Sequence, residues 1–245
     1  MHKFIYDCFR QLGKSLLHFV YPSKCLHCRA LLSPEPIVLC HDCSSSLELI
    51  NPEERCPRCF HFLSDEGELC QICIKYPSLY AGIASCFEYE GPAGTLIRQL
   101  KYYNQSYLAQ GMGAFLVAQW ERLHWPIPDV IVPVPISFLR WMERKYNQSD
   151  LLAQEMSRFL RCPTKNVLRR KSGDYSQAEL SLEQRRQLQD DRFSFHHSFS
   201  LKNKVVLVVD DVVTSGHTLH RCAQILKEQE PTALYAITFC KTHSV

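Results

Sequence analysis

Eight of the thirteen cysteines in this chain occur as four Cys-x-x-Cys pairs in the first third of the sequence. The pairs are Cys25/Cys28, Cys40/Cys43, Cys56/Cys59 and Cys70/Cys73. One such pair brings two thiolates to a tetrahedral ion from a single tight turn, so two pairs complete a closed site of four thiolates. The spacing therefore predicts two structural zinc sites. The gaps do not decide which pairs combine, but consecutive pairing is favoured because it closes the smaller loops.

Two other cysteine chemistries fit this region less well. Iron–sulfur clusters usually have tighter or less regular spacings, and a thioredoxin-like redox site needs one pair inside a βαβ unit. The region is poor in apolar residues, so we expect the metal to supply folding energy. The other cysteines are scattered and are expected to be buried structural thiols: Cys8, Cys86, Cys162, Cys222 and Cys240.

A second stretch with chemical potential follows the apolar run 205–209. It consists of Asp210 and Asp211, the small-residue turn Thr214-Ser215-Gly216, and His217-Thr218 at the start of a helix. Such a turn and the first helical N–H groups form a cradle for an anion, and the helix dipole strengthens it. Acids beside a phosphate would repel it unless they held another group, and ribose hydroxyls are natural partners of carboxylates. The pattern predicts a site for a ribose that carries a 5′-phosphate.

Two alternatives remain for the acidic pair. An apolar strand followed by Asp-Asp resembles a Walker B strand, but that function needs a Gly-x-x-x-x-Gly-Lys-Ser/Thr loop, and the chain has none. The other alternative is an ordinary strand–turn–helix junction with capping hydroxyls, in which the acids hold no ligand.

An α/β scaffold is predicted around these residues. Strands are expected at about 83–89, 129–135, 205–209 and 234–240, and helices at about 93–103, 107–123, 147–161 and 217–229. The alternation indicates a parallel sheet, and the all-apolar run 205–209 is typical of a strand buried on both faces. The polar stretch 169–192 is predicted to be a long loop that leads into a solvated helix.

The N-terminal segment has apolar residues at a helical period and ends at Pro22. We expect a helix that packs on the rest of the protein or, alternatively, contacts a membrane face or a partner. The predicted domains are therefore an amphipathic helix at 1–22, a small double zinc ribbon at 23–80 and an α/β domain at 81–245.

The composition excludes several classes of protein. Hydrophobic residues make up 46% and charged residues 22%, as in a globular protein and unlike a disordered chain. The net charge of +3 offers no general electrostatic argument for nucleic-acid binding. No stretch has the roughly 20 apolar residues of a membrane span, and the N-terminus lacks a signal-peptide pattern. We expect the protein to be in the cytoplasm, where it can also lie at the inner face of the membrane.

Together these motifs resemble those of one known family. The stretch from Val206 to Thr218 is similar to the phosphoribosyl-pyrophosphate signature of type I phosphoribosyltransferases. From about Pro22 to Phe239 the chain resembles the ComF family, competence-associated phosphoribosyltransferase-like proteins with an N-terminal double zinc ribbon. Other matching stretches are 87–92, 97–102, 132–137, Arg144 with 146–148, and Gln177 with 180–181 and Arg185. Lys145 departs from the family pattern, which usually has Gly there.

The resemblance implies a type I phosphoribosyltransferase-like parallel sheet of about five strands with flanking helices. A small hood, built from about residues 82–107, would cover ligands at the carboxyl ends of the strands. Asp210 and Asp211 would hold the ribose hydroxyls and stabilise positive charge at C1. Residues 214–218 would hold the 5′-phosphate, and magnesium would bridge ligand oxygens. The pyrophosphate candidates are Pro135, Ile136, Ser137, Arg144, Arg170 and Arg185.

Two functions fit this resemblance. One is a phosphoribosyltransferase, linked to DNA uptake, that binds magnesium–phosphoribosyl pyrophosphate or a related 5′-phosphoribosyl ligand. The other is a non-catalytic adaptor that binds nucleotides or single-stranded DNA and docks on the ATPase of a DNA-uptake machinery. An aromatic–basic cluster would stack bases or pack in the hood; it consists of Lys101, Tyr102, Tyr103 and Tyr107.

Overall fold

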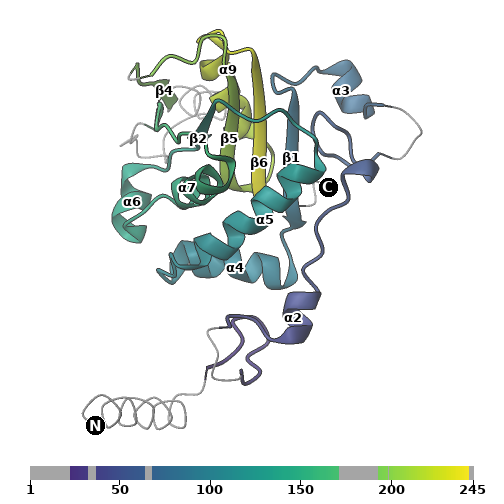
Figure 1. The fold of residues 1–245 in the computed structure, drawn as a ribbon, viewed down its shortest axis with the longest axis vertical. Coiled ribbons are helices and arrows are strands. Elements are labelled where there is room, and N and C mark those ends of the chain that lie inside the picture. The colour runs from purple at the N-terminus through teal and green to yellow at the C-terminus, as the bar shows by residue number, and fades with distance from the viewer. Residues whose placement is uncertain (1–22, 33–36, 64–67, 171–192, 198, 243–245) are drawn as a thin grey trace, which may run out of the picture.

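A four-stranded parallel sheet forms the centre of the molecule, in the order β1-β6-β5-β2 (Figure 1). The strands are β1 (Gly82–Glu88), β2 (Val130–Pro133), β5 (Val205–Val213) and β6 (Ala233–Lys241). This computed structural model describes residues 23–32, 37–63, 68–170, 193–197 and 199–242. All four predicted strands are present. β5 is longer than predicted, so that Asp210 and Asp211 lie inside the strand and not after its end.

The described part of the sheet differs from two details of the expectation. About five strands were expected, but the described residues form four, and beyond β2 only one parallel bridge joins Ile131 to Thr164. The segment expected to begin a separate hood belongs to the main sheet, since β1 pairs with β6 from Gly82 to Glu88. Most of β1 is buried, so an apolar strand here is more stable within the sheet than above it.

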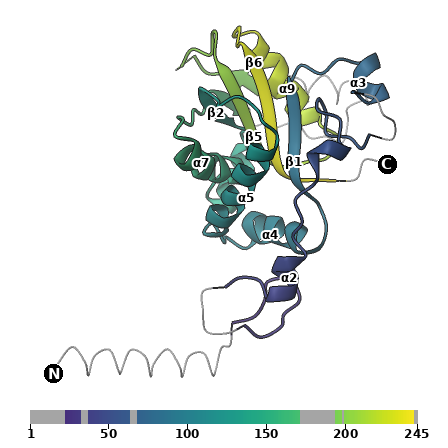
Figure 2. The same cartoon turned by 45° about the vertical axis from the view of Figure 1, so that its right-hand side comes forward.

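Helices cover both faces of the sheet (Figure 2). On one face lie α4 (Gly91–Tyr102), α5 (Leu108–Arg122) and α7 (Gln148–Leu160), and on the other lies α9 (His217–Lys227). These four helices lie close to their predicted ranges. A fifth, α6 (Phe138–Arg144), was not predicted. The short antiparallel strands β3 (Leu168–Arg170) and β4 (Phe193–Phe195) pair with each other.

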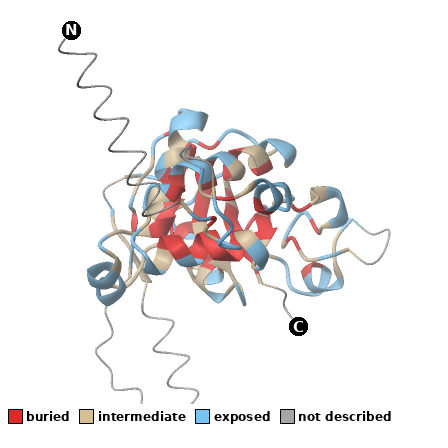
Figure 3. Cartoon of the chain, turned by 90° about the horizontal axis from the view of Figure 1, so that it is seen from below, coloured by how far each residue is buried: buried red, intermediate tan, exposed pale blue. Residues whose placement is uncertain are grey.

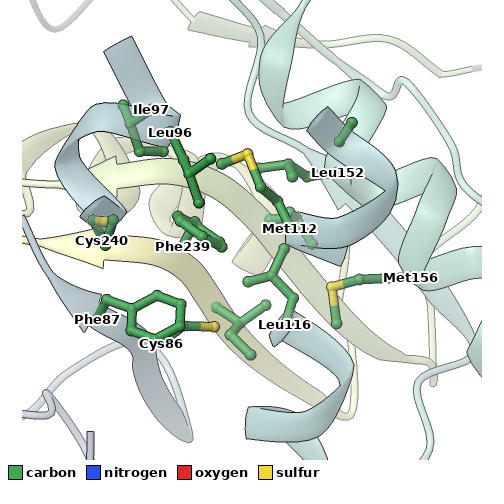
Figure 4. Close-up of a cluster of buried hydrophobic side chains, with 14 of the residues drawn as sticks. Cys86, Phe87, Leu96, Ile97, Met112, Leu116, Leu152, Met156, Phe239 and Cys240 are labelled. Carbon is green, nitrogen blue, oxygen red and sulfur yellow. The ribbon is translucent and has the colours of Figure 1, made fainter. Parts of the chain in front are cut away.

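Alternate residues of the central strands fill two apolar layers, as the period of a strand dictates. Val209 and Phe239 face α4, α5 and α7, whereas Val208 and Ala236 face α9. Figure 4 shows Phe239 among side chains of α4 and α5, and its ring centroid lies 5.1 Å from that of Phe87. Buried residues are concentrated in and around the sheet (Figure 3). This packing holds the carboxyl ends of β2 and β5 in a fixed relation.

The cysteine-rich region forms two small units that contact different parts of the α/β domain (Figure 1). The first contains α2 (His41–Ser45) and meets α4, where His27 Nδ1 lies 2.9 Å from Thr95 Oγ1. The second contains α3 (Gln71–Lys75) and follows the short 3₁₀ helix Pro52–Glu54. It lies beside β1, and the Ile83 N–H donates to the Arg58 carbonyl oxygen at 3.1 Å.

Several predictions fall outside the described residues. These are the N-terminal helix at 1–22, with Cys8, and the helix expected within 169–192, with Arg185. Among the described residues, no helix is both long enough and apolar enough to cross a membrane.

Candidate functional site

The eight paired cysteines form two clusters, one from each small unit. The first cluster joins Cys25, Cys28, Cys40 and Cys43, and the second joins Cys56, Cys59, Cys70 and Cys73; within each, the sulfur atoms lie within 4.8 Å of one another. The favoured consecutive pairing is therefore confirmed. A tetrahedral zinc ion with bonds of about 2.3 Å needs sulfurs about 3.8 Å apart, and the Cys28–Cys40 and Cys59–Cys70 sulfurs lie 3.5 Å and 3.4 Å apart. Both clusters fit zinc and leave no ligand position open for catalysis.

The two clusters repeat one local structure. In each, the fourth residue after the first cysteine has a positive φ, 67° at Arg29 and 61° at Phe60, and the last two cysteines lie at the start of a short helix. Burial opposes ionisation of Cys25, but backbone N–H groups outweigh it and lower the pKa of this thiol to about 6. The same balance lowers the pKa of Cys56 to about 7. The first cysteine of each turn thus favours the thiolate that a metal binds.

The acidic pair lies at the carboxyl end of β5 and is held by two helices. The Asp210 Oδ1 atom accepts hydrogen bonds from the Ser149 hydroxyl of α7 at 2.8 Å and from the Asp211 N–H at 2.9 Å. The Asp211 Oδ1 atom lies 2.8 Å from Lys101 Nζ of α4. Burial and the neighbouring Asp211 charge raise the pKa of Asp210 to about 7, against the opposing effects of Ser149 and Lys101. One carboxyl of the pair can therefore be neutral near physiological pH.

The predicted phosphate loop directly follows this strand. Thr214 and Ser215 form the turn, and Gly216 begins α9 with a φ of 73°. A Cβ atom on Gly216 would meet no protein atom within 4 Å, so glycine is favoured here for its backbone conformation. His217 and Thr218 are in the first turn of α9, whose N–H groups have no acceptor within the helix. The loop has the donors and the dipole that a phosphate needs.

A cavity of about 740 Å³ lies between this loop and the second cysteine unit. Ser215, Gly216 and His217 line one side, and Ile72 and Tyr76 belong to the facing unit. The sequence did not predict that the second zinc ribbon borders the phosphate loop. No local pattern indicates it, because the contact depends on where the ribbon packs beside β1.

The pyrophosphate candidates are only partly brought together. Pro135, Ile136 and Arg170 line a cavity of about 550 Å³, different from the one at the phosphate loop. Ser137 begins α6, where its side chain accepts from the Arg140 N–H at 3.4 Å. Arg144 ends that helix and donates to Gln148 Oε1 at 3.1 Å. Because Pro133 is in register with Val209, this segment and the phosphate loop leave the sheet at the same edge.

Two residues of the site were missed in their observed roles. Ser149 was not singled out, and Lys101 was assigned to an aromatic–basic cluster and not to the acidic pair. The neighbouring Tyr102, Tyr103 and Tyr107 are between 60% and 67% exposed, so they do not pack in a hood. The contact of Lys101 with Asp211 joins positions far apart in the chain, and only the tertiary packing of α4 reveals it.

Comparison with known proteins agrees with this architecture. Residues 148–244 match the family model described as phosphoribosyl transferase domain, and residues 16–74 match the double zinc ribbon domain. Competence protein F of Haemophilus influenzae is 31% identical over 214 residues, which cover 84% of this chain and 91% of that relative. The chain belongs to the ComF family. A second ComF-like relative, DNA utilization protein YhgH of Escherichia coli K12, is 29% identical over 228 residues, which cover 90% of this chain and 98% of the relative.

Solved structures that resemble this ComF-family chain include a purine phosphoribosyltransferase from Pyrococcus horikoshii. It has a TM-score of 0.36 and 20% sequence identity, over 57% of this chain and 79% of that one. The structure explains the ComF pattern at the position where this chain has Lys145. Lys145 follows α6 as its C-cap with a φ of 67°, a conformation that favours the glycine usual in the family.

Proposed function

We propose that this ComF-family protein binds a 5-phosphoribosyl ligand at the carboxyl edge of its sheet. Phosphoribosyl pyrophosphate is the compound that represents this class of ligand. One observation carries the proposal. The acidic pair on β5 is followed, after Val212 and Val213, by the loop of Thr214, Ser215 and Gly216 and the N-terminus of α9. Carboxylates suit ribose hydroxyls, and helical N–H groups with a glycine cap suit a phosphate, so one ligand with both groups accounts for the whole stretch.

The roles follow from these positions. Residues 214–218 would hold the 5′-phosphate, and Asp210 and Asp211 would accept the ribose hydroxyls. In a transfer reaction the carboxylates would also stabilise the positive charge that develops at C1 as pyrophosphate leaves. Ser149 would keep Asp210 oriented, because it holds one carboxylate oxygen. Segment 135–144 leaves the same edge of the sheet and would face the pyrophosphate.

Magnesium fits this site only together with the ligand. One oxygen of Asp211 is already paired with Lys101, and one oxygen of Asp210 already accepts two hydrogen bonds. A hard cation that prefers several oxygen ligands would therefore be held mainly by the ligand's pyrophosphate and ribose oxygens, whose charge it would offset. The protein's part is to orient the ribose and to bind both phosphate ends.

The test is a thermal melt of the zinc-loaded protein near neutral pH. Magnesium–phosphoribosyl pyrophosphate at 100 times its dissociation constant should stabilise the folded protein by about 2.7 kcal/mol, or roughly 5–10 °C for a chain of this size. The variant Asp210→Asn with Asp211→Asn should lose most of this shift. Gly216→Val should also weaken the response, because a β-branched residue at a φ of 73° is strained. A wild-type melt that does not respond at millimolar ligand contradicts the proposal.

A second candidate function is a non-catalytic adaptor that binds nucleotides or single-stranded DNA in a DNA-uptake machinery. The names of the relatives, competence protein F and DNA utilization protein, favour a role in handling DNA. Three exposed tyrosines in the segment between Lys101 and α5 offer stacking surfaces: Tyr102, Tyr103 and Tyr107. Steady release of pyrophosphate with any nucleobase supports the enzyme. Salt-dependent binding of single strands without turnover supports the adaptor.

A further inference from the structure

The ion pair between Lys101 and Asp211 involves one of the two acids of the proposed ribose site. The two charged atoms are 2.8 Å apart, and the side chains are only 19% and 10% exposed. In such an enclosed pair each charge depends on the other, because removal of one partner leaves the second charge buried without compensation. Any ligand that takes over Asp211 must therefore also satisfy the ammonium group of Lys101.

The residues on either side of Lys101 hold the end of α4 in place. The Tyr146 hydroxyl donates to the Leu100 carbonyl oxygen at 2.6 Å. The Arg144 guanidinium lies 5.3 Å from the centre of the Tyr102 ring. Both contacts join the end of α4 to the segment that follows β2, where the pyrophosphate is proposed to bind. The end of α4, with Lys101, is thus held against both the acidic pair and the segment that is proposed to face the pyrophosphate.

The chemistry of the ligand decides whether the exchange is favourable. Ribose hydroxyls that donate to Asp211 compete with Lys101 for the same carboxylate. A ligand with a phosphate or diphosphate on C1 offers the displaced ammonium group a new anion close by. A ligand with only a 5′-phosphate, such as ribose 5-phosphate, offers none on that side.

We propose that Lys101 makes the site selective for ribose 5-phosphates that carry a second anionic group on C1. In the empty site Lys101 neutralises Asp211, and in the loaded site it releases Asp211 to the hydroxyls and pairs with the C1 phosphate. This inference rests on the proposed function, because it assumes that a 5-phosphoribosyl ligand binds at the acidic pair.

Calorimetric binding to the full-length, zinc-loaded protein tests the proposal, with phosphoribosyl pyrophosphate and ribose 5-phosphate as probes in the presence of magnesium. Lys101→Met should weaken the binding of phosphoribosyl pyrophosphate by about tenfold to a hundredfold, as expected for the loss of one hydrogen bond between charged groups. Its effect on ribose 5-phosphate should be much smaller. Lys101→Arg should retain most of the selectivity. The matched control is Lys202→Met, which removes another ion-paired lysine, 2.7 Å from Glu230, at an exposed position.

The outcomes separate the two proposals. If Lys101→Met weakens the binding of both ligands equally, or of neither, then Lys101 does not determine selectivity. The proposed function can stand in that case. If the wild-type protein binds neither ligand, the proposed function fails and this inference fails with it. Should the Met variant not fold, as judged by its melt and zinc content, Lys101→Gln provides the same comparison, because it keeps a donor but removes the charge.

Discussion

At the scale of single residues, ionisation of the acidic pair costs free energy, because one carboxyl is buried beside the charge of the other. Asp210 has its pKa raised to about 7 from an ordinary value of 3.8, chiefly by burial and then by the charge of Asp211. The folded protein therefore holds a proton that the unfolded chain releases at much lower pH. Stability from this source is present at acidic pH and is lost as the pH rises from about 4 through 7.

This balance predicts a pH-dependent effect of Asp210→Asn on the ligand-free protein. At pH 8 the variant should be more stable by about 4 kcal/mol, because it removes a carboxylate that is costly to ionise in the folded state. At pH 5 the gain should be smaller, about 1–2 kcal/mol, because Asp210 is still neutral in the folded protein although the unfolded chain has already released its proton. Denaturant unfolding at both pH values measures this. Glu230→Gln is the control: the pKa of Glu230 is lowered by Lys202, so its effect should not grow over this range.

The unusual lysine at the end of α6 gives a second prediction at this scale. Lys145 has a φ of 67°, and a residue with a side chain is strained there by about 1–2 kcal/mol. Lys145→Gly should therefore raise the free energy of unfolding, by about 1 kcal/mol once the entropy of glycine in the unfolded chain is counted. A loss of stability would show that the lysine side chain makes a contact worth more than the strain.

At the scale of elements, the contact between α5 and α7 depends on one glycine. A Cβ atom on Gly113 would lie 2.4 Å from the Cβ of Glu155, whereas one on Gly111 would meet nothing within 4 Å. Gly113→Ala should force the helices apart and cost about 1–3 kcal/mol. Gly111→Ala, two residues earlier in the same helix, should stabilise the protein by about 0.5–1 kcal/mol. Opposite signs in thermal unfolding would establish the close approach; equal signs would refute it.

The two zinc ribbons should differ in their effect on the ligand site. Cys59 and Cys73 line the cavity that the phosphate loop also borders, while the first cluster belongs to the unit that meets α4. Cys59→Ser should therefore remove most of the thermal shift caused by phosphoribosyl pyrophosphate, and Cys28→Ser should retain more of it. A ribbon that behaves as an independent domain would leave the shift unchanged in both variants. Ligand melts of the two variants, each with its zinc content measured, decide between these outcomes.

Sequence patterns predicted local elements well and the contacts between them poorly. The Cys-x-x-Cys spacing and the run 205–218 predicted the metal clusters and the strand–turn–helix, because neighbours in sequence make these features. The position of β1 in the main sheet was not predicted, since periodicity reports burial and not which strand is the neighbour. The pairing of Lys101 with Asp211 was missed for a related reason: both positions are locally ordinary, and only the packing of α4 on the sheet brings them together.

At the scale of the whole molecule, folding of the cysteine-rich region in the first third of the chain should depend on bound zinc. Elemental analysis of metal-replete protein should give about two zinc ions per chain, held by the eight thiolates of the two clusters. Chelation should unfold both ribbons, because these segments have few apolar residues with which to form a core. A zinc content near zero, or a coloured iron species, would contradict this assignment.

The strand order has a consequence for how the protein is made. β6 is the last strand in the chain, yet it lies between β1 and β5. During synthesis, β1 has no partner in the sheet until residue 241 has left the ribosome. Until then its apolar edge is exposed and can associate with other chains. The second zinc ribbon precedes β1 and lies against it. A ribbon that takes up its metal early would cover one edge of β1 during this time and leave only the edge that pairs with β6, so scarce zinc should lower the yield of newly made protein more than it harms protein already folded.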